Sequence, residues 1–578
     1  YRLLGLGKLE RRTTNTPATK LVQFCTVWLT RLAFMIAYVC KYTPIEIIKA
    51  FGEDVFYIEP EISSYENAEK LLHPNMCSFA KAIVESVLQN DIKSLVLTNC
   101  CDSIKRVYDV LKDRVEFIEI IDLPRENTPE ACQFFYYQLE TFKSKLSKRL
   151  NKEFDEEVFR NQVNNLIAQN IDSSFDIAIM GARAKKELVE FVCSTAGGKV
   201  LNLTCSGERL CQDDVKFDGR LESYAKVLLS FLPCMRMNIK REFIEKNSFK
   251  GIIYNTIKFC DFYSFEYAKI KEKNNVLKIE TDYSQNANEQ VRTRVEAFIE
   301  KTLQKATTSK SISNKKYFAG IDSGSTSTNA VVIDSSKNIL GYCTVKTGFD
   351  VVSSAKLALS KACEMAGINE EDISFITSTG YGRISIPFSN IQVTEITCHA
   401  KGAHAIFPSA RTIIDIGGQD SKVIKIDKDG NVVDFVMNDK CSAGTGRFIE
   451  YMARVLELEL EDFSRCLNFS EDLTISSMCT VFAESEVISL IAQGKRREDI
   501  IRAINKVVAI KAVSLVNRVK GEKDFVITGG VAKNKGVVLE LERRLGSRLL
   551  IPFDPQIVGA LGAALIGLEN NKASSCFT

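Results

Sequence analysis

Two stretches in the second half of the chain repeat the same order of residues. Residues 318–334 ("FAGIDSGSTSTNAVVID") and residues 411–427 ("RTIIDIGGQDSKVIKID") each join an apolar run ending near an Asp to a polar, glycine-containing turn and a second apolar run. This order is typical of a β-hairpin whose turn presents backbone N–H and hydroxyl groups to phosphate. Two matched hairpins predict two related lobes with a phosphate-bearing ligand held by both.

The two turns supply the groups that a nucleoside triphosphate and its Mg²⁺ need. Asp322 and Asp415 are placed to hold Mg²⁺ or its water ligands. Gln419 lacks the basicity of a general base, so we expect it to orient the attacking water or the γ-phosphate. The stretch "VITGGVAKNKG" (526–536) is expected on the nucleoside side. The remaining expected nucleotide contacts are Ser323, Gly324, Ser325, Thr326, Gly417, Gly418, Gly529, Gly530 and Lys533.

A third glycine-rich turn carries a thiol. In "NDKCSAGTGRF" (438–448), Cys441 stands three residues before a turn that leads into a predicted helix. Backbone N–H groups at such a helix start bind phosphate, so Gly444, Thr445 and Gly446 are expected to sense it. A cysteine in a protein is most often a small buried hydrophobe, and phosphate binding alone does not require a thiol at this place.

The first half has a different pattern. Short apolar runs such as "SLVLTN", "IAIMG" and "GIIYNTIKF" alternate with amphipathic segments, which predicts a parallel α/β sheet. Residues 302–318 are rich in Ser, Thr and Lys and lack apolar periodicity, as a linker does. We therefore expect a first region at 1–305, of two α/β subdomains, a linker at 306–317 and a second region at 318–578.

Cysteines of the first half follow its predicted strands. Open parallel sheets place ligand sites at the carboxyl ends of their strands, so these thiols are expected to converge on one crevice as cluster ligands. Packing residues are the alternative. Cys77 heads an amphipathic helix, where the dipole favours a thiolate. The expected ligands are Cys77, Cys100, Cys101, Cys205, Cys234 and Cys260, with Cys132 and Cys211 as substitutes for Cys100.

Composition excludes several classes of protein. The net charge is +3, so no global positive field favours nucleic acid. Residues 21–40 are apolar enough to raise a membrane helix, but Arg31 at their centre is costly in a bilayer, which favours a buried strand and helix. The 18 cysteines occur without a secretory pattern, so we expect reduced thiols or metal ligands in a cytoplasmic protein.

The second half resembles the activators of 2-hydroxyacyl-CoA dehydratases, the BadF/BadG/BcrA/BcrD-type ATPases of the actin, sugar kinase and heat-shock chaperone superfamily. "GIDSGSTST", "STGYGR", "EITCHAKGA", "NDKCSAGTGRF", "CTVFAESEV" and "PQIVGALGAAL" carry the resemblance. It implies a two-lobed ATPase and a homodimer in which Cys441 and Cys479 of each chain hold one shared 4Fe-4S cluster.

The first half resembles the dehydratase-type electron acceptors, and among them the double-cubane cluster proteins. "YTPIEIIKAFG", "LNLTC", "PCMRM", "KFCDFYSFEYAKIK" and "LKIETDYS" carry this resemblance, over residues 36–300. It implies a Rossmann-like parallel-sheet domain with a double-cubane or a 4Fe-4S cluster. Three thiolates for each of two cubanes account for six cysteines.

These resemblances predict an ATP-dependent iron-sulfur reductase. The second half is expected to use ATP and Mg²⁺ to drive an electron from its cluster into the first half, which reduces a small molecule. A ferredoxin or flavodoxin is the expected donor. Two alternatives are a 2-hydroxyacyl-CoA dehydratase fused to its activator and an iron-free ATPase of the sugar kinase or chaperone kind.

Overall fold

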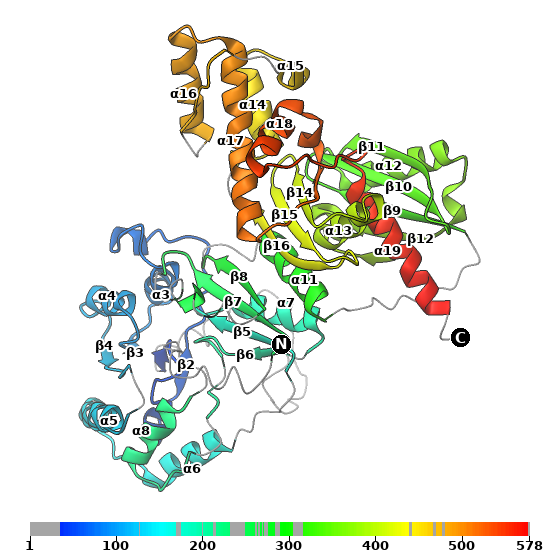
Figure 1. The fold of residues 1–578 in the computed structure, drawn as a ribbon. Helices are drawn as coiled ribbons and strands as arrows, with labels where there is room; N and C mark the ends of the chain where they lie inside the picture. Colours follow the sequence, from blue (N-terminus) through cyan, green and yellow to red (C-terminus); the bar gives the residue numbers. More distant parts are fainter. Residues whose placement is uncertain are drawn as a thin grey trace, which may run out of the picture. The chain divides into compact units, whose positions relative to one another are not determined.

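The computed structural model describes most of the chain: residues 35–125, 128–168, 175–198, 200–207, 209–211, 215–231, 249–260, 263, 266–268, 270, 275–283, 289–303, 316–438, 442–465, 470–476 and 480–575. The chain divides into two compact units, Tyr1–Arg292 and Thr293–Thr578. Figure 1 shows their helices and strands.

The first unit begins with a four-stranded parallel sheet in the order β2-β1-β3-β4. Its strands are β1 (Ile36–Tyr38), β2 (Val55–Tyr57), β3 (Ser94–Thr98) and β4 (Phe117–Ile121). Its helices are α2 (Ile45–Ala50), the 3₁₀ turn η1 (Ala68–Lys70), α3 (Ser78–Gln89), α4 (Asp102–Leu111), α5 (Pro129–Leu150) and α6 (Glu156–Ile167). Helix α5 begins at a proline because Thr128 caps it by accepting a hydrogen bond from the Ala131 N–H.

A second four-stranded parallel sheet follows in the order β6-β5-β7-β8. Its strands are β5 (Ile177–Gly181), β6 (Val200–Asn202), β7 (Gly251–Ile257) and β8 (Val276–Thr281). Its helices are α7 (Lys186–Ala196) and α8 (Leu221–Leu229), and the chain then enters α11 (Glu289–Leu303). The two sheets confirm the predicted parallel α/β class for the first half.

A buried arginine joins the ends of these two sheets. Arg183 follows β5 and is 1% exposed. Its guanidinium donates to the carbonyl of Val39, 2.7 Å away, and to that of Ile58, 2.6 Å away, just beyond β1 and β2. An ion pair with Glu59 at 2.9 Å compensates the buried charge. The carboxyl ends of both sheets therefore face one another.

The first lobe of the second unit is a five-stranded sheet in the order β11-β10-β9-β12-β13. Strands β9 to β11 form an antiparallel meander, and β12 runs parallel to β9. The elements are β9 (Tyr317–Ser323), β10 (Ser327–Asp334), β11 (Ile339–Lys346), α12 (Val351–Ala366), η3 (Glu370–Asp372), β12 (Ile373–Thr379), η4 (Tyr381–Ser385), β13 (Ile391–Gln392) and α13 (Glu395–Ile406).

The second lobe repeats this plan in the order β16-β15-β14-β17, with a meander of three strands and β17 parallel to β14. The elements are β14 (Thr412–Ile416), β15 (Ser421–Ile426), β16 (Val432–Asn438), α14 (Gly446–Val455), α15 (Leu460–Arg465), α16 (Thr480–Ala492), α17 (Arg497–Arg518), β17 (Phe525–Thr528), η5 (Gly530–Lys533), α18 (Lys535–Leu545) and α19 (Val558–Ser575). The matched hairpins predicted from the sequence are β9–β10 and β14–β15.

Helices α13 and α19 cross at glycines. A Cβ on Gly562 of α19 would lie 1.8 Å from the Cys398 carbonyl oxygen of α13, and one on Gly402 would lie 2.1 Å from the Val558 carbonyl oxygen. Gly320 of β9 approaches the Ala560 carbonyl in the same way. The end of the chain thereby packs on the first lobe after passing through the second, as α19 does in Figure 1.

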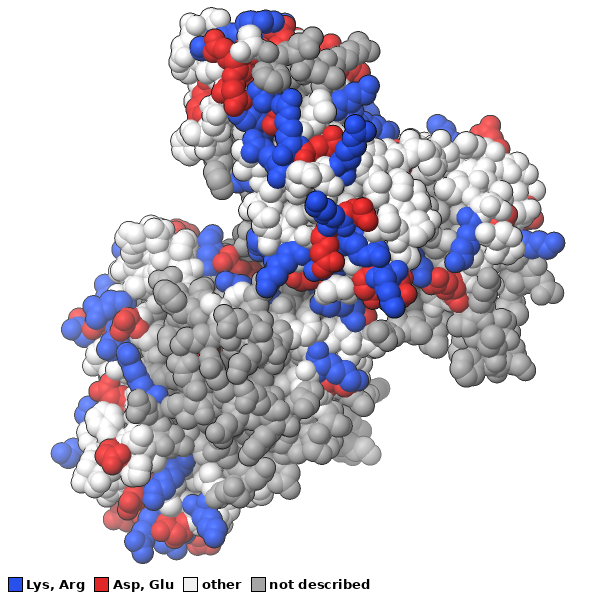
Figure 2. Space-filling model, in the orientation of Figure 1, with Lys and Arg blue, Asp and Glu red and all other residues white. Residues whose placement is uncertain are grey.

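Two further expectations from the sequence concern the surface and the linker. No helix within the described ranges has the length and apolar character needed to span a bilayer. On the face drawn in Figure 2, Lys and Arg are interspersed with Asp and Glu. The apolar stretch at 21–40 lies outside the described residues except for 35–40, and the expected linker at 306–317 does so except for Lys316 and Tyr317.

The helix crossing leads to a stability prediction. Gly562→Ala should cost about 1 to 3 kcal/mol because a backbone oxygen occupies the space of the new methyl group. The melting temperature of the second unit, followed by circular dichroism, should fall by several degrees. Glu569 is on the same helix as Gly562, and Glu569→Gln removes only the exposed end of its ion pair with Lys401 of α13, so it should shift the melting temperature little. Equal melting temperatures for both variants would contradict the close contact.

Candidate functional site

The turns after β9 and β14, which are expected to bind phosphate, open on one cavity of the second unit. The cavity measures about 740 Å³ and is lined by residues of both lobes. Eleven of the residues predicted from the sequence lie in its lining: Asp322, Gly324, Ser325, Thr326, Asp415, Gly417, Gly418, Gly446, Gly529, Gly530 and Lys533. The arrangement can hold a ligand of nucleotide size with its phosphates against the turns.

The turn after β14 is held by the loop that was singled out for its cysteine. The Gly446 N–H donates to the Gly417 carbonyl and the Arg447 N–H to the Gly418 carbonyl, both at 2.9 Å. The Ser421 hydroxyl donates to the Gly444 carbonyl at 2.5 Å. The turn after β14 is therefore in direct contact with residues 444–447.

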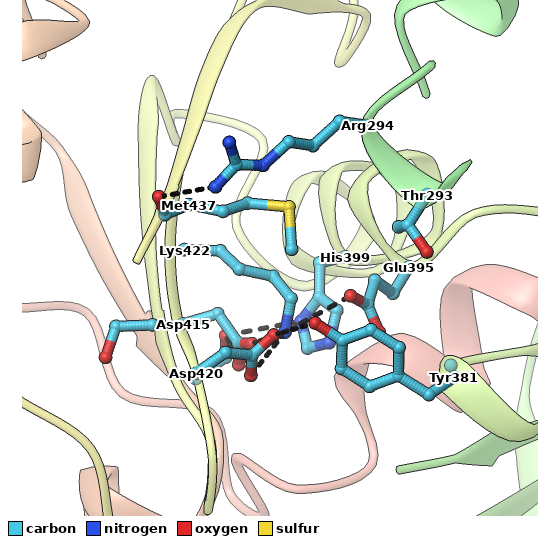
Figure 3. Close-up of polar contacts among 12 residues, drawn as sticks. Thr293, Arg294, Tyr381, Glu395, His399, Asp415, Asp420, Lys422 and Met437 are labelled. Carbon is cyan, nitrogen blue, oxygen red and sulfur yellow. Dashed lines mark hydrogen bonds and ion pairs between the residues drawn. The ribbon is translucent and has the colours of Figure 1, made fainter. Parts of the chain in front are cut away.

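A buried network of charges forms one wall of the cavity (Figure 3). The Lys422 ammonium lies 2.8 Å from an oxygen of Asp420 and 3.4 Å from oxygens of both Asp415 and Glu395. The Tyr381 hydroxyl donates to Asp420 at 2.9 Å. One lysine thus compensates three carboxylates that would otherwise repel one another.

A histidine of α13 lies between the two aspartates expected to hold Mg²⁺. His399 Nε2 is 3.8 Å from Asp322, and His399 Nδ1 is 3.7 Å from Asp415. The Thr528 hydroxyl, at the end of β17, donates to Asp415 at 2.8 Å. The first and second lobes therefore contribute one aspartate each, and the crossing helix contributes the histidine.

The protonation of these groups follows from burial and from their neighbours. Burial, together with Glu395 and Asp415, raises the pKa of Asp322 to about 7. Burial also raises the pKa of Glu395 and lowers that of His399. Burial opposes the charge of Asp415, but His399 and Lys422 outweigh it and lower its pKa.

Some predicted residues lie beside the cavity rather than in its lining. Ser323 and Thr445 are buried, and Gly444 takes part through its carbonyl. The Gln419 side chain is exposed, whereas its neighbour Asp420 is buried and lines the cavity. The roles assigned to these four residues stay predictions.

Sequence reasoning missed the charged wall itself. Tyr381, Glu395, His399, Asp420 and Lys422 all line the cavity. Of these five residues, only Asp420 and Lys422 lie within the hairpin motif. In the sequence, Lys422 is a polar residue in the polar and apolar alternation of a predicted strand. The other three residues lie in "STGYGR" and "EITCHAKGA". These motifs carry the family resemblance, and the sequence assigned no role to their residues.

Both cysteines expected to hold the shared cluster, Cys441 and Cys479, lie outside the described residues. The next residue after each of them is described. The Ser442 and Thr480 hydroxyls are hydrogen-bonded to each other at 2.7 Å. Two segments 38 residues apart in the sequence thus meet directly beside the predicted ligands.

Thiols of the first unit gather at the carboxyl ends of its strands. Hydrogen bonds join Cys77 to Cys260, and Cys100 to both Cys40 and Cys101. Cys40 and Cys260 lie close enough to Cys205 for their charges to raise its pKa. Cys234 lies outside the described residues, and the substitutes Cys132 and Cys211 are buried in the core of the unit. Cys40, two residues after β1, was not among the predicted ligands.

Burial and hydrogen bonding make it costly to deprotonate Cys205 and Cys100 in a metal-free protein. Burial raises the pKa of Cys205 to about 12, and the hydrogen bond with Cys40 and Cys101 raises that of Cys100. The charges of Arg183 and Lys41 lower the pKa of Cys205 in opposition to burial. Within the described ranges, no three His, Cys, Asp or Glu side chains surround one point as ligands of a single metal ion do. Ligands of a cubane each bind a different iron atom and need not converge in that way.

The fold and the cavity define a two-lobed α/β protein with a cavity of nucleotide size lined by both lobes. Comparison with protein families makes the assignment specific: residues 319–567 match the BadF/BadG/BcrA/BcrD ATPase family, and residues 40–171 and 177–302 match the 2-hydroxyglutaryl-CoA dehydratase D-component. The chain belongs to the BadF/BadG/BcrA/BcrD ATPase family and carries a dehydratase D-component region before its ATPase region.

Individual relatives align with the second half of the chain. The activator of lactoyl-CoA dehydratase from Anaerotignum propionicum is 48% identical over 254 residues, which are 44% of this chain and 98% of the relative. The (R)-2-hydroxyglutaryl-CoA dehydratase activating ATPase from Acidaminococcus fermentans is 44% identical, over 43% of this chain and 96% of the relative. Among solved structures, the activator of 2-hydroxyisocaproyl-CoA dehydratase from Clostridium difficile with bound ADPNP is 40% identical, with a TM-score of 0.44, over 45% of this chain and 98% of that one.

The charged wall leads to a prediction about Lys422. Lys422→Met should destabilise the second unit by about 3 to 5 kcal/mol because three buried carboxylates lose their cation. In the folded variant these carboxyl groups should have raised pKa values and bind protons that the unfolded chain releases. The loss should therefore be smallest near pH 5 and should grow as the pH rises to 8.

Thermal melting of both proteins across this pH range checks the prediction. Lys425→Met is the matched control, because Lys425 is on the same strand and pairs with the exposed Glu522 at the surface. A loss for Lys422→Met that is independent of pH would mean that Lys422 does not compensate the carboxylates.

Proposed function

We propose that this protein is an ATP-dependent, low-potential electron-transfer enzyme, in which the ATPase region delivers electrons to the D-component region of the chain. The observation that carries the proposal is the pair of bonds from Gly446 and Arg447 to the turn at Gly417 and Gly418. They link the candidate phosphate site to the segment that follows Cys441. Nucleotide binding and the environment of that thiol are then physically connected.

The nucleotide part of the proposal uses residues of both lobes. Asp322 and Asp415 hold Mg²⁺ or its waters, and the two turns hold the phosphates. Lys533 and the glycines after β17 face the nucleoside. ATP hydrolysis then moves the two lobes between two conformational states. The nucleotide shifts the equilibrium between these states by the difference in its affinity for them.

The electron-carrying part of the ATPase region is placed at Cys441 and Cys479. Consecutive Cα atoms lie about 3.8 Å apart, so the contact between Ser442 and Thr480 supports a pair of thiolates on one site. Two thiolates per chain complete a 4Fe-4S cluster only in a homodimer. The exposed apolar side chains of α16, Val481, Phe482 and Ile488, support an interface beside that site.

The thiols of the first unit fit an iron-sulfur cluster by their chemistry. Thiolate is the ligand that such clusters need, and buried thiolates are stabilised by iron and by the Arg183 charge. Cys40, Cys77, Cys101, Cys205 and Cys260 would hold it, with Cys100 or Cys234 completing six ligands for a double cubane. When bound, the cluster supplies one-electron chemistry at low potential, and the residues around it set its burial and charge.

The D-component match favours one second candidate. Dehydration of a 2-hydroxyacyl-CoA by this chain would use the same ATPase region with a single 4Fe-4S cluster in the first unit. In either case a low-potential donor of the ferredoxin or flavodoxin type supplies the electrons. A small molecule is the acceptor in the main proposal, and a thioester is the substrate in the alternative.

The role of Asp322 can be tested through pH. Because its pKa is raised to about 7, this carboxyl group is protonated at lower pH and cannot hold Mg²⁺ or its waters. Binding of Mg-ADPNP, measured by calorimetry, should weaken as the pH falls from 8 to 6. Asp322→Asn should bind weakly at every pH and lose most ATPase activity. A variant with the pH profile and activity of the natural protein would exclude Asp322 from the site.

Iron content tests the electron-transfer proposal and its alternatives. Anaerobically purified protein should contain roughly two iron atoms per chain from the shared cluster and roughly eight from a double cubane, or roughly four if the first unit holds one 4Fe-4S cluster. Cys441→Ser or Cys479→Ser should remove only the first portion, and Cys77→Ser or Cys260→Ser only the second.

Cys343→Ser is the matched control, because Cys343 lies on β11 of the first lobe and is not among the expected cluster ligands. Iron and acid-labile sulfide, measured with electron paramagnetic resonance of the reduced protein, give the result. ATP hydrolysis by a chain without iron would favour an ATPase of the kinase or chaperone kind instead.

A further inference from the structure

Helix α11 lies at the end of the region that matches the dehydratase D-component, but most of the helix packs in the second compact unit. The match extends to residue 302, whereas the second compact unit begins at Thr293. Val295, Phe298 and Ile299 are buried, and Ala297 packs in one apolar cluster with residues of α13, including Ile396. Most of this helix is therefore a structural part of the unit that holds the nucleotide cavity.

A carboxylate of α11 caps α13. Glu300 accepts hydrogen bonds from the Thr394 N–H at 3.2 Å, the Thr394 hydroxyl at 2.6 Å and the Thr397 hydroxyl at 2.6 Å. Thr394 is the N-cap residue of α13 and makes no side-chain capping bond of its own. Glu300 thus places a negative charge at the positive end of the helix dipole.

This cap lies next to the nucleotide cavity. Glu395, the first residue of α13, lines the cavity and contacts Lys422, and His399 lies one turn further along. The position of the first turn of α13 therefore decides where two of the cavity's ionisable groups lie.

A second carboxylate of α11 acts on the first lobe. Glu296 pairs with Arg383, which follows β12 and is 2% exposed. Arg383 also donates to the Gly380 carbonyl at 2.9 Å. Gly380 is so close to the cavity that a Cβ there would lie 2.6 Å from an oxygen of Asp322. Glu296 is thus connected through Arg383 and Gly380, by three successive contacts, to the aspartate expected to hold Mg²⁺.

The helix also contacts the second lobe. Arg294 donates to the Met437 carbonyl on β16 at 3.2 Å, and Figure 3 shows Thr293 and Arg294 beside the charged wall. A helix held by Arg383 in one lobe, by Met437 in the other and by α13 between them has to respond when the lobes move.

We propose that α11 is a positioning helix of the nucleotide site, in which Glu300 and Glu296 set the positions of Glu395 and Asp322, and that nucleotide binding in turn changes the stability of α11. The inference rests on the proposed nucleotide site. Both carboxylates lie before the ATPase family match, which begins at residue 319, so the D-component region supplies them. Since coupling between sites is reciprocal, the last helix of the D-component region reports the nucleotide state to that region.

The first test compares variants of the full-length protein for Mg-ADPNP binding by calorimetry. Glu300→Gln keeps the shape of the side chain but removes the charge and points an amide at the Thr394 and Thr397 donors. Its dissociation constant should rise on the order of tenfold, as expected for a charge-assisted hydrogen bond. Glu289→Gln is the matched control, because Glu289 is an exposed residue on the same helix. Equal binding by the two variants would overturn the proposal.

The second test measures hydrogen exchange of α11 with and without nucleotide. A helix with a purely structural role would show no nucleotide-dependent change in exchange. In the natural protein, amides of α11 from residue 293 to 303 should exchange more slowly with Mg-ADPNP than without nucleotide. Glu300→Gln should reduce this difference, and Glu300→Asp should restore part of it. Identical exchange of α11 with and without bound nucleotide would show that the helix is not coupled to the site.

These experiments distinguish failure of the proposed function from failure of the inference about α11. If the natural protein binds no nucleotide, the proposed function fails before α11 is tested. If Glu300→Gln does not fold, Thr397→Val removes one donor without leaving a buried charge unpaired. It should weaken binding in the same direction by a smaller factor, and unchanged binding by this variant would contradict the proposal.

Discussion

The charge of one buried lysine allows the rest of the second unit to assemble. Lys422 lies among Asp415, Asp420 and Glu395, and without it these three carboxyl groups would be buried with no cation to compensate them. The three carboxylates come from two elements, the β14–β15 hairpin and helix α13. Lys422 therefore holds the crossing helix against the second lobe, and His399 continues this link to Asp322 in the first lobe. Asp322, Asp415 and Asp420, beside the two candidate phosphate turns, are thereby in contact with the charged wall.

Sequence patterns predicted the hairpins because a phosphate-binding turn is a local structure. Asp322 and Asp415, with the glycines that follow, need only their own strand and turn to take their positions. The charged wall is different, because Glu395 and Lys422 are far apart in the sequence and each has meaning only beside the other. The same holds for α11, whose carboxylates act on Thr394 and Arg383. Its helical pattern is visible in the sequence, but its packing partner is not.

The cysteines of the first unit include some whose shared location could be predicted from the sequence and one, Cys40, whose location could not. Cys77, Cys101, Cys205 and Cys260 follow strands or precede helices in a parallel sheet, so their common edge could be predicted from topology. Cys40 follows a strand of only three residues at the end of a long apolar stretch, and no alternation marked that strand in the sequence. Pairing of β1 with β2 and β3 brings Cys40 beside Cys100, which only the folded sheet reveals.

The closeness of these thiols has a consequence for a chain that meets oxygen. Cys77 and Cys260 are in hydrogen-bond contact, as are Cys40 and Cys100, so loss of the proposed cluster would leave pairs of thiols beside each other. Such pairs form disulfides through a sulfenic acid or by exchange, and burial then shields the product from cellular reductants. Assembly of the proposed cluster in an air-exposed chain would require reduction of these disulfides before iron and sulfide are supplied.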